Sequence, residues 1–168
     1  MNNKNVTIQE ALFAGGCFWG VEYYLQKLPG VLATQVGYTG GHKDNPTYSE
    51  VCSGNTGHVE AIHIIFDPQQ ISYRKLNQYF FEIHDPTQTN GQGPDLGEQY
   101  LSRIYYYDDK QKAEAQILIA ELQQQGYNVA TQILPVTTFW PAEAYHQSYY
   151  LKTQHQPYCH GYVKRFKD

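Results

Sequence analysis

A cysteine stands between glycines and aromatic residues in the segment FAGGCFWGVE, residues 13–22. Cys17 follows a short apolar stretch that stops at paired glycines, and it begins a helical pattern, so we expect its thiol at a helix N-terminus. Backbone N–H groups and the helix dipole favour a thiolate there, which predicts a lowered pKa for Cys17. The position alone leaves two interpretations open, a reactive nucleophile or a small buried side chain. Phe18 and Trp19 follow directly, and an apolar group such as a methyl would meet their rings.

A second candidate is a carboxyl group in an apolar strand pattern. In HVEAIHIIF, residues 58–66, alternation places Glu60 on one face with three large apolar side chains, Ile62, Ile64 and Phe66. The opposite face is also largely apolar, so we expect a central strand that is buried on both sides. Burial there raises the pKa of a carboxyl and keeps it protonated, able to donate a proton or a hydrogen bond. A solvated or ion-paired Glu60 at the end of the strand is the alternative.

The seven histidines and the other two cysteines allow further chemistries. Two groups contain residue types that bind metals in proteins, namely Cys52 with His58 and His63, and Cys159 with His146, His155 and His160. Neither group has the paired-ligand spacing of a zinc finger, so we expect ordinary polar residues. A Cys–His hydrolase also stays open, although no histidine is singled out as its base.

These side chains must be positioned by an alternation of strands and helices. The apolar patterns predict strands over residues 10–16, 31–41, 58–68, 102–108 and 129–136. They predict helices over residues 17–28, 72–83, 109–126 and 141–152, with Ser72 as one cap. Residues 45–54 are predicted as a short helix or turn, with Asn45 or Thr47 near its cap. Residues 84–100 form a long loop, and long loops inside compact domains are often functional.

Length, charge and cysteine usage limit the protein class. The 168 residues suit a single catalytic domain, 1–168, whose C-terminal tail begins at about residue 153. A net charge of −4 gives no electrostatic basis for binding nucleic acid or an anionic membrane. Without a secretion signal or a long apolar run, we expect a soluble, cytoplasmic protein and no membrane association. Three cysteines make a poor disulfide framework, so any disulfide in a reducing compartment would be catalytic.

Four segments together resemble the type A peptide methionine sulfoxide reductases. They are GCFWG at 16–20, YSEVCSGNTGHVEAI at 48–62, GPDLGEQY at 93–100 and FWPAEAYHQ at 139–147, in that family's order. The resemblance covers nearly the whole chain and implies reduction of methionine-S-sulfoxide, free or in proteins, with no metal or organic cofactor. We expect an α+β fold, a two-layer ferredoxin-like sandwich whose mixed, mainly antiparallel sheet carries the helices.

The resemblance also implies roles for individual residues. Cys17 matches the nucleophile that attacks the sulfoxide sulfur, and Glu60 matches the acid that protonates the oxygen. Tyr48 and Tyr100 match the two phenols that hold this oxygen, while Asp95 matches a polar residue of the same site. The protonated Glu60 inferred from strand alternation is the form that this chemistry requires.

A second thiol completes the cycle that the family implies. Phe18 and Trp19 match the walls around the substrate methyl, and methionine leaves Cys17 as a sulfenic acid. Cys159, on a tail that we expect to be free to swing, matches the resolving thiol that closes a disulfide. Thioredoxin would then reduce that disulfide, and we expect the protein to act as a monomer. Cys52 matches a cysteine that the chemistry does not need, so we interpret it as structural.

The chain departs from the family pattern at four places. Leu101 stands where an Arg is usual, and Ala144 stands where an Asp is usual, which affects supporting ion pairs. The tail reads QPYC instead of NGYC and contains no second cysteine, which favours a mechanism with a single resolving thiol. His146 is retained, and we interpret it as a supporting residue.

Overall fold

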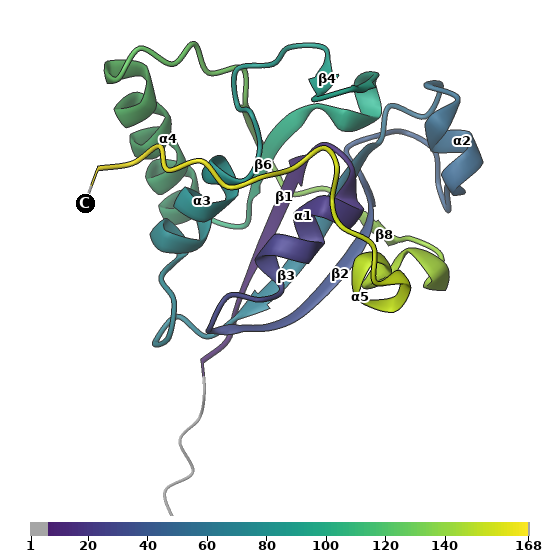
Figure 1. Cartoon of the computed structure of the whole chain (residues 1–168), viewed down its shortest axis with the longest axis horizontal. Helices are drawn as coiled ribbons and strands as arrows, with labels where there is room; N and C mark the ends of the chain where they lie inside the picture. Colours follow the sequence, from purple (N-terminus) through teal and green to yellow (C-terminus); the bar gives the residue numbers. More distant parts are fainter. Residues whose placement is uncertain (1–6, 168) are drawn as a thin grey trace, which may run out of the picture.

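The computed structural model describes residues 7–167, so residues 1–6 and 168 of the expected domain lie outside it. One mixed sheet with helices against it forms the body of the protein (Figure 1). Its strands are β1 Gln9–Gly15, β2 Val31–Thr39, β3 Val59–Phe66, β6 Ser102–Tyr106, β7 Gln132–Pro135 and β8 Phe139–Pro141. The helices are α1 Phe18–Leu25, α2 Tyr48–Cys52, α3 Tyr73–Glu82, α4 Asp109–Gln124 and α5 Tyr149–Thr153.

The six strands run in the order β7-β6-β1-β3-β2-β8. Strands β6 and β7 pair in parallel, whereas β1 pairs antiparallel with β3 and β6, and β2 pairs antiparallel with β3 and β8. Strand β3 therefore lies between two neighbours. Its Glu60 face is fully buried, whereas the opposite face is half-buried at His63 and Ile65, so the predicted burial on both sides is confirmed only in part. The expected combination of a mixed sheet with packed helices is confirmed.

The main core lies between the sheet and helices α1, α3 and α4. It joins sheet residues such as Phe13 and Ile62 to buried residues of α3, including Leu76 and Phe80. Helix α3 begins where predicted, because the Ser72 hydroxyl accepts a hydrogen bond from the Lys75 amide at 3.0 Å. A smaller apolar cluster covers the other face, and Leu101, one of the departures from the family pattern, packs against it.

The predicted final helix over 141–152 forms only at its end, as α5, and the prediction is wrong for residues 141–148. Pro141 ends strand β8, residues Ala144–His146 form a 3₁₀ turn, and Ser148 has a left-handed backbone with φ of 51°. The cause is tertiary, because the Gln147 amide bonds to both backbone groups of Val36 at 2.9 Å. These bonds hold the segment against β2 and leave only α5 helical.

The predicted loop 84–100 contains short regular elements. Two two-residue strands, β4 Gly91–Gln92 and β5 Asp95–Leu96, form a small hairpin, and a 3₁₀ turn η1 follows at Glu98–Tyr100. The buried Gln92 side chain fixes the hairpin, since its amide oxygen accepts from the Asp85 amide at 2.7 Å and its nitrogen donates to the Asp85 carbonyl at 2.9 Å. The loop is therefore a rigid platform for Asp95 and Tyr100.

The C-terminal tail is held in place, in contrast to the freely swinging tail that we expect from the sequence. It passes over α1 and continues to α3 (Figure 1). The Val163 amide donates to the Glu82 carbonyl at 2.7 Å, and the Arg165 amide donates to the Glu82 carboxylate at 3.0 Å. Phe166 is buried in the main core beside Phe81. Within residues 7–167, no helix has the length and apolar character needed to cross a membrane.

Candidate active site

Cys17 lies in the turn that joins β1 to α1. Gly16 supplies this turn with φ of 94°, a backbone conformation that favours glycine, and a Cβ there would press against the Gln92 side chain. Cys17 then forms the N-cap of α1, and its side chain is only 7% exposed. The glycine-flanked segment therefore places the thiol at a helix N-terminus, as predicted.

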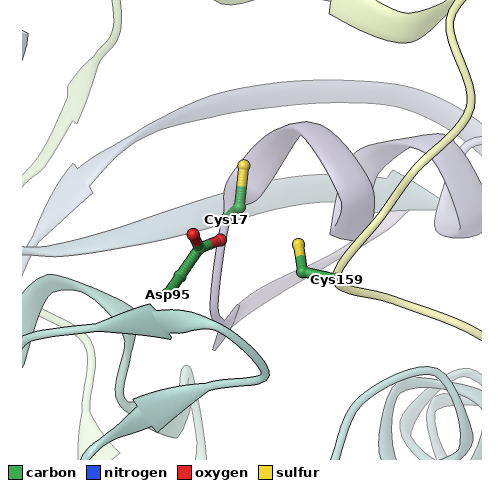
Figure 2. A group of neighbouring side chains, drawn as sticks. All are labelled: Cys17, Asp95 and Cys159. Carbon is green, nitrogen blue, oxygen red and sulfur yellow. The ribbon is translucent and has the colours of Figure 1, made fainter.

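Two thiols and a carboxylate meet at this point. The sulfur atoms of Cys17 and Cys159 and a carboxylate oxygen of Asp95 lie within 4.8 Å of one another. Figure 2 shows that they come from three places, the start of α1, the small hairpin and the tail. Both cysteines are free thiols, so the pair can close to a disulfide after a short movement.

The electrostatics of Cys17 differ from the prediction of a lowered pKa. Hydrogen bonding with the Cys159 thiol and then burial raise the pKa of Cys17 above its ordinary value. The amides of Trp19 and Gly20 lower it, as expected at a helix N-terminus, but they are outweighed. In this arrangement Cys17 is a protonated thiol, because the tail sulfur covers it.

Glu60 lies on the central strand, next to the turn that carries Cys17. It is 2% exposed, its Oε1 accepts a hydrogen bond from the Phe18 amide at 3.1 Å, and its Oε2 has no partner among the described residues. Burial raises its pKa well above the ordinary value, and the charge of Asp95 acts in the same direction. This agrees with the protonated carboxyl predicted from strand alternation, and the solvated alternative is wrong.

Tyr48 and Tyr100 lie on the short elements around this carboxyl. A capping box fixes the first, because the Thr47 hydroxyl accepts from the Glu50 amide while the Glu50 carboxylate accepts from the Thr47 amide. Burial is the main cause that raises the pKa of both tyrosines, followed for Tyr48 by a hydrogen bond with the Cys52 side chain. Both phenols therefore keep their hydrogen at neutral pH and remain hydrogen-bond donors.

The carboxylate of Asp95 is hydrogen-bonded to a side chain of the C-terminal tail. The Tyr158 hydroxyl donates to its two carboxylate oxygens at 3.0 and 3.1 Å. The sequence interpretation did not include Tyr158, although it directly precedes Cys159 and so had to lie near any site that this cysteine reaches. Tyr158 and Cys159 together cover the side of the site that faces the tail.

The aromatic pair after the nucleophile packs around a buried histidine. The Trp19 indole donates to His146 Nδ1 at 2.9 Å and stacks on Tyr149, with ring centroids 3.7 Å apart. Phe18 and Tyr48 also face His146, at centroid distances of 5.1 and 4.6 Å. His146 therefore ties the two predicted aromatic residues to Tyr48, which fits the supporting position expected for it.

Neither of the two groups of possible metal ligands, Cys52 with His58 and His63 or Cys159 with His146, His155 and His160, is assembled in the part of the chain that the structure describes. Among the described residues, the ligand atoms that come close enough for one ion belong to Cys17, Asp95 and Cys159. His160 does contact Cys159, with its Nδ1 3.1 Å from the cysteine sulfur. The structure thus brings together a different set from those that the residue types suggested.

A buried thiol next to a protonated acid and a second thiol is the arrangement of a thiol oxidoreductase. The family model for peptide methionine sulfoxide reductase matches residues 9–168. Relatives with that name from Pasteurella multocida and Nautilia profundicola are 50% and 49% identical over 90% and 89% of this chain, and 87% of each relative is covered. The structure of reduced Mxr1 from Saccharomyces cerevisiae matches with a TM-score of 0.84 and 34% identity, covering 96% of this chain and 95% of Mxr1.

The chain belongs to the peptide methionine sulfoxide reductase family. Its activity is the thiol-dependent reduction of methionine sulfoxide to methionine.

Proposed function

We propose that this chain reduces the S epimer of methionine sulfoxide, free or within polypeptides, with Cys17 as nucleophile and Cys159 as resolving thiol. The observation that supports this most strongly is the position of both sulfur atoms and the Asp95 carboxylate within 4.8 Å of one another. The names of the relatives leave the epimer open, and methionine sulfoxide reductases handle one epimer each.

The first chemical step uses Cys17 and Glu60. The Cys17 sulfur attacks the sulfoxide sulfur while Glu60 supplies a proton or hydrogen bond to the oxygen, on which negative charge collects. The unpaired Oε2 of Glu60 is the atom suited to this contact. The oxygen then passes to Cys17: its bond to the substrate sulfur breaks and a bond to the Cys17 sulfur forms. Methionine leaves, and Cys17 becomes a sulfenic acid whose O–H hydrogen balances the hydrogen lost from the thiol.

Tyr48, Tyr100 and Asp95 hold the substrate during this step. Both phenols stay protonated and can donate to the sulfoxide oxygen, where each preorganised donor contributes on the order of 10²-fold in rate. Asp95 accepts hydrogen bonds from Tyr158 in the closed arrangement, so it is available to a polar group of the substrate once the tail moves.

Phe18 and Trp19 form the apolar side of the substrate site. Phe18 is buried beside Tyr38, whereas Trp19 is partly exposed and held by His146. A methyl group on the substrate sulfur packs against these rings, because aromatic surfaces bury apolar groups well. Tyr48 packs against the same His146 ring as Phe18, so a donor for the oxygen lies next to the apolar side of the site.

The second step returns the oxygen as water. Cys159 attacks the sulfenic acid on Cys17, and the resulting disulfide is reduced by thioredoxin. The structure of Mxr1 from Saccharomyces cerevisiae has been solved in complex with Trx2, which supports thioredoxin as the reductant of the present chain as well. The three free thiols suit a reducing compartment, so we propose that the protein works in the cytoplasm. We also propose that it acts as a monomer.

We also propose that the catalytic domain is ferredoxin-like at its centre. Apart from the short elements α2, β4, β5 and η1, the chain order is β1-α1-β2-β3-α3-β6. Together with the sheet order β6-β1-β3-β2, it supports the βαββαβ arrangement of that fold. On this view residues 1–168 form one catalytic domain, and the tail from about residue 153 is its resolving segment.

An assay on separated epimers of a methyl sulfoxide substrate tests the proposal, with dithiothreitol or thioredoxin as the electron source. We expect turnover of the S epimer only. Activity should be lost completely in Cys17→Ser and retained in Cys52→Ser, which removes a thiol that does not belong to the group of Cys17, Asp95 and Cys159. Turnover without any reductant would instead indicate a hydrolase, and stoichiometric zinc in the purified protein would indicate a metal-binding module. Reduction of the R epimer, or activity in Cys17→Ser, would contradict the proposal.

A further inference from the structure

His160 follows Cys159 and places its ring beside the nucleophile turn. The ring is 8% exposed, its Nε2 lies 2.7 Å from the Gly15 carbonyl oxygen, and its Nδ1 lies 3.1 Å from the Cys159 sulfur. The first chemical step described above does not use this histidine. The function of this buried imidazole, which contacts the sulfur of the proposed resolving thiol, is therefore still to be explained.

The two contacts determine which nitrogen carries the hydrogen. A carbonyl oxygen only accepts hydrogen bonds, so Nε2 must donate to Gly15. In the neutral ring, Nδ1 then holds the lone pair and accepts from the Cys159 S–H. Burial lowers the pKa of His160, so the ring is neutral at neutral pH, although the Gly15 carbonyl and the charge of Asp95 act in the opposite direction.

The turn around Cys17 leaves room for this ring. A Cβ on Gly20 would overlap the imidazole, and a Cβ on Gly16 would come within 3.3 Å of Nε2. The glycines that flank the nucleophile therefore also accommodate His160. The imidazole is held by the same backbone that presents Cys17, so its position relative to both sulfurs is fixed.

We propose that His160 is the general base of the disulfide-forming step. This inference rests on the proposed function, because it concerns the sulfenic acid that methionine sulfoxide leaves on Cys17. A cysteine thiol is mostly protonated at neutral pH, whereas the thiolate is the attacking form. His160 Nδ1 takes the proton of Cys159 as its sulfur attacks Cys17. The S–S bond forms, the S–O bond breaks, and the leaving hydroxide receives the proton and departs as water.

A single-turnover experiment tests this role. Reduced enzyme is mixed with one equivalent of a methionine-S-sulfoxide substrate and no reductant, and both released methionine and lost thiols are followed. His160→Gln keeps an amide N–H for the Gly15 carbonyl but has no basic nitrogen. We expect it to release methionine at the wild-type rate and to form the disulfide about 10²-fold more slowly, as is typical for lost base catalysis. Dimedone should trap the accumulated sulfenic acid, detected by mass.

The pH profile separates base catalysis from mere positioning. The charged and titratable groups near His160 include Cys159, Asp95 and His84, together with Cys17 and Tyr24 of the first helix and its turn. In the wild type, the rate of disulfide formation should be flat above the lowered pKa of His160. In His160→Gln it should rise about tenfold per pH unit, since ionisation of the thiol then has to supply the thiolate. His160→Asn should show the same profile.

His155→Gln is the matched control, because it changes an exposed histidine of the same tail. It should leave both rates unchanged. Disulfide formation at the wild-type rate in His160→Gln would overturn the proposal, and so would a slower rate with the wild-type pH dependence. Failure of the proposed function would be recognised separately, as absence of methionine release by the wild type.

Discussion

Replacement of Glu60 by glutamine separates two contributions of this carboxyl. The acid is buried, and its Oε2 is free to contact the substrate oxygen. Removing acid catalysis altogether, as in Glu60→Ala, should slow methionine release by about 10²- to 10⁴-fold. Glu60→Gln cannot transfer a proton but still donates a hydrogen bond. Since one such donor alone supplies about 10²- to 10³-fold, we expect the glutamine variant to lose only about tenfold.

The same substitution should change stability in a pH-dependent way. Glu60 has a folded-state pKa raised above its ordinary value of 4.5, so its favourable contribution is fully present below that value. It is lost as the pH rises through the raised folded-state pKa, because ionisation then opposes burial. Each pKa unit by which the folded-state value exceeds the ordinary one corresponds to about 1.4 kcal/mol in the free energy of unfolding. Glu60→Gln should therefore be more stable than the wild type at pH 8, and this advantage should disappear near pH 4.

The two effects are measured on the same protein preparations. Methionine release is followed by rapid quench under single-turnover conditions, and the free energy of unfolding is measured by urea denaturation between pH 4 and 9. Glu114→Gln, on α4, is the control for a glutamate that lies outside the site. Equal losses of activity in the alanine and glutamine variants would refute hydrogen-bond donation by Glu60. A stability difference that does not change with pH would show that Glu60 is already ionised in the folded protein.

The remaining predictions concern the tail. Cys159→Ser should still release one equivalent of methionine but lose thioredoxin-driven turnover, since no thiol is left beside Cys17; unchanged turnover would assign the resolving role elsewhere. Phe166→Ala should lower the free energy of unfolding by about 3 kcal/mol, as expected for truncating a buried phenylalanine. It should also slow disulfide formation without affecting the first methionine, because the far end of the tail is then no longer anchored. Identical disulfide kinetics in this variant would mean that Cys159 is positioned by its local contacts alone.

Local patterns were sufficient to predict most of the regular elements. Alternation identified the central strand β3 and the burial of Glu60, and helical spacing together with Ser72 identified α3. The failure at 141–148 has a specific cause, since the bonds from Gln147 to β2 connect residues more than a hundred positions apart. A periodic pattern cannot report such a contact.

In the candidate site, too, local features were predicted correctly and features that depend on distant contacts were not. Cys17 and Glu60 were predicted with the correct surroundings, because a turn before a helix and an apolar strand are local features. The raised pKa of Cys17 was not predicted, since it depends on a tail residue that folds back against the first helix. His160 was noticed only as a metal-binding residue type, and its contact with the Gly15 carbonyl requires the tertiary fold.

The proximity of Cys17 and Cys159 has a consequence for the oxidised form of the chain. A covalent bond between them closes a loop of about 140 residues, which includes most of the sequence. In the chain-entropy model, a cross-link that closes a loop of this length lowers the entropy of the denatured state, which raises the free energy of unfolding by about 5 kcal/mol. Oxidation therefore makes the protein most resistant to denaturation at the stage of the cycle when it has spent its electrons and awaits a donor.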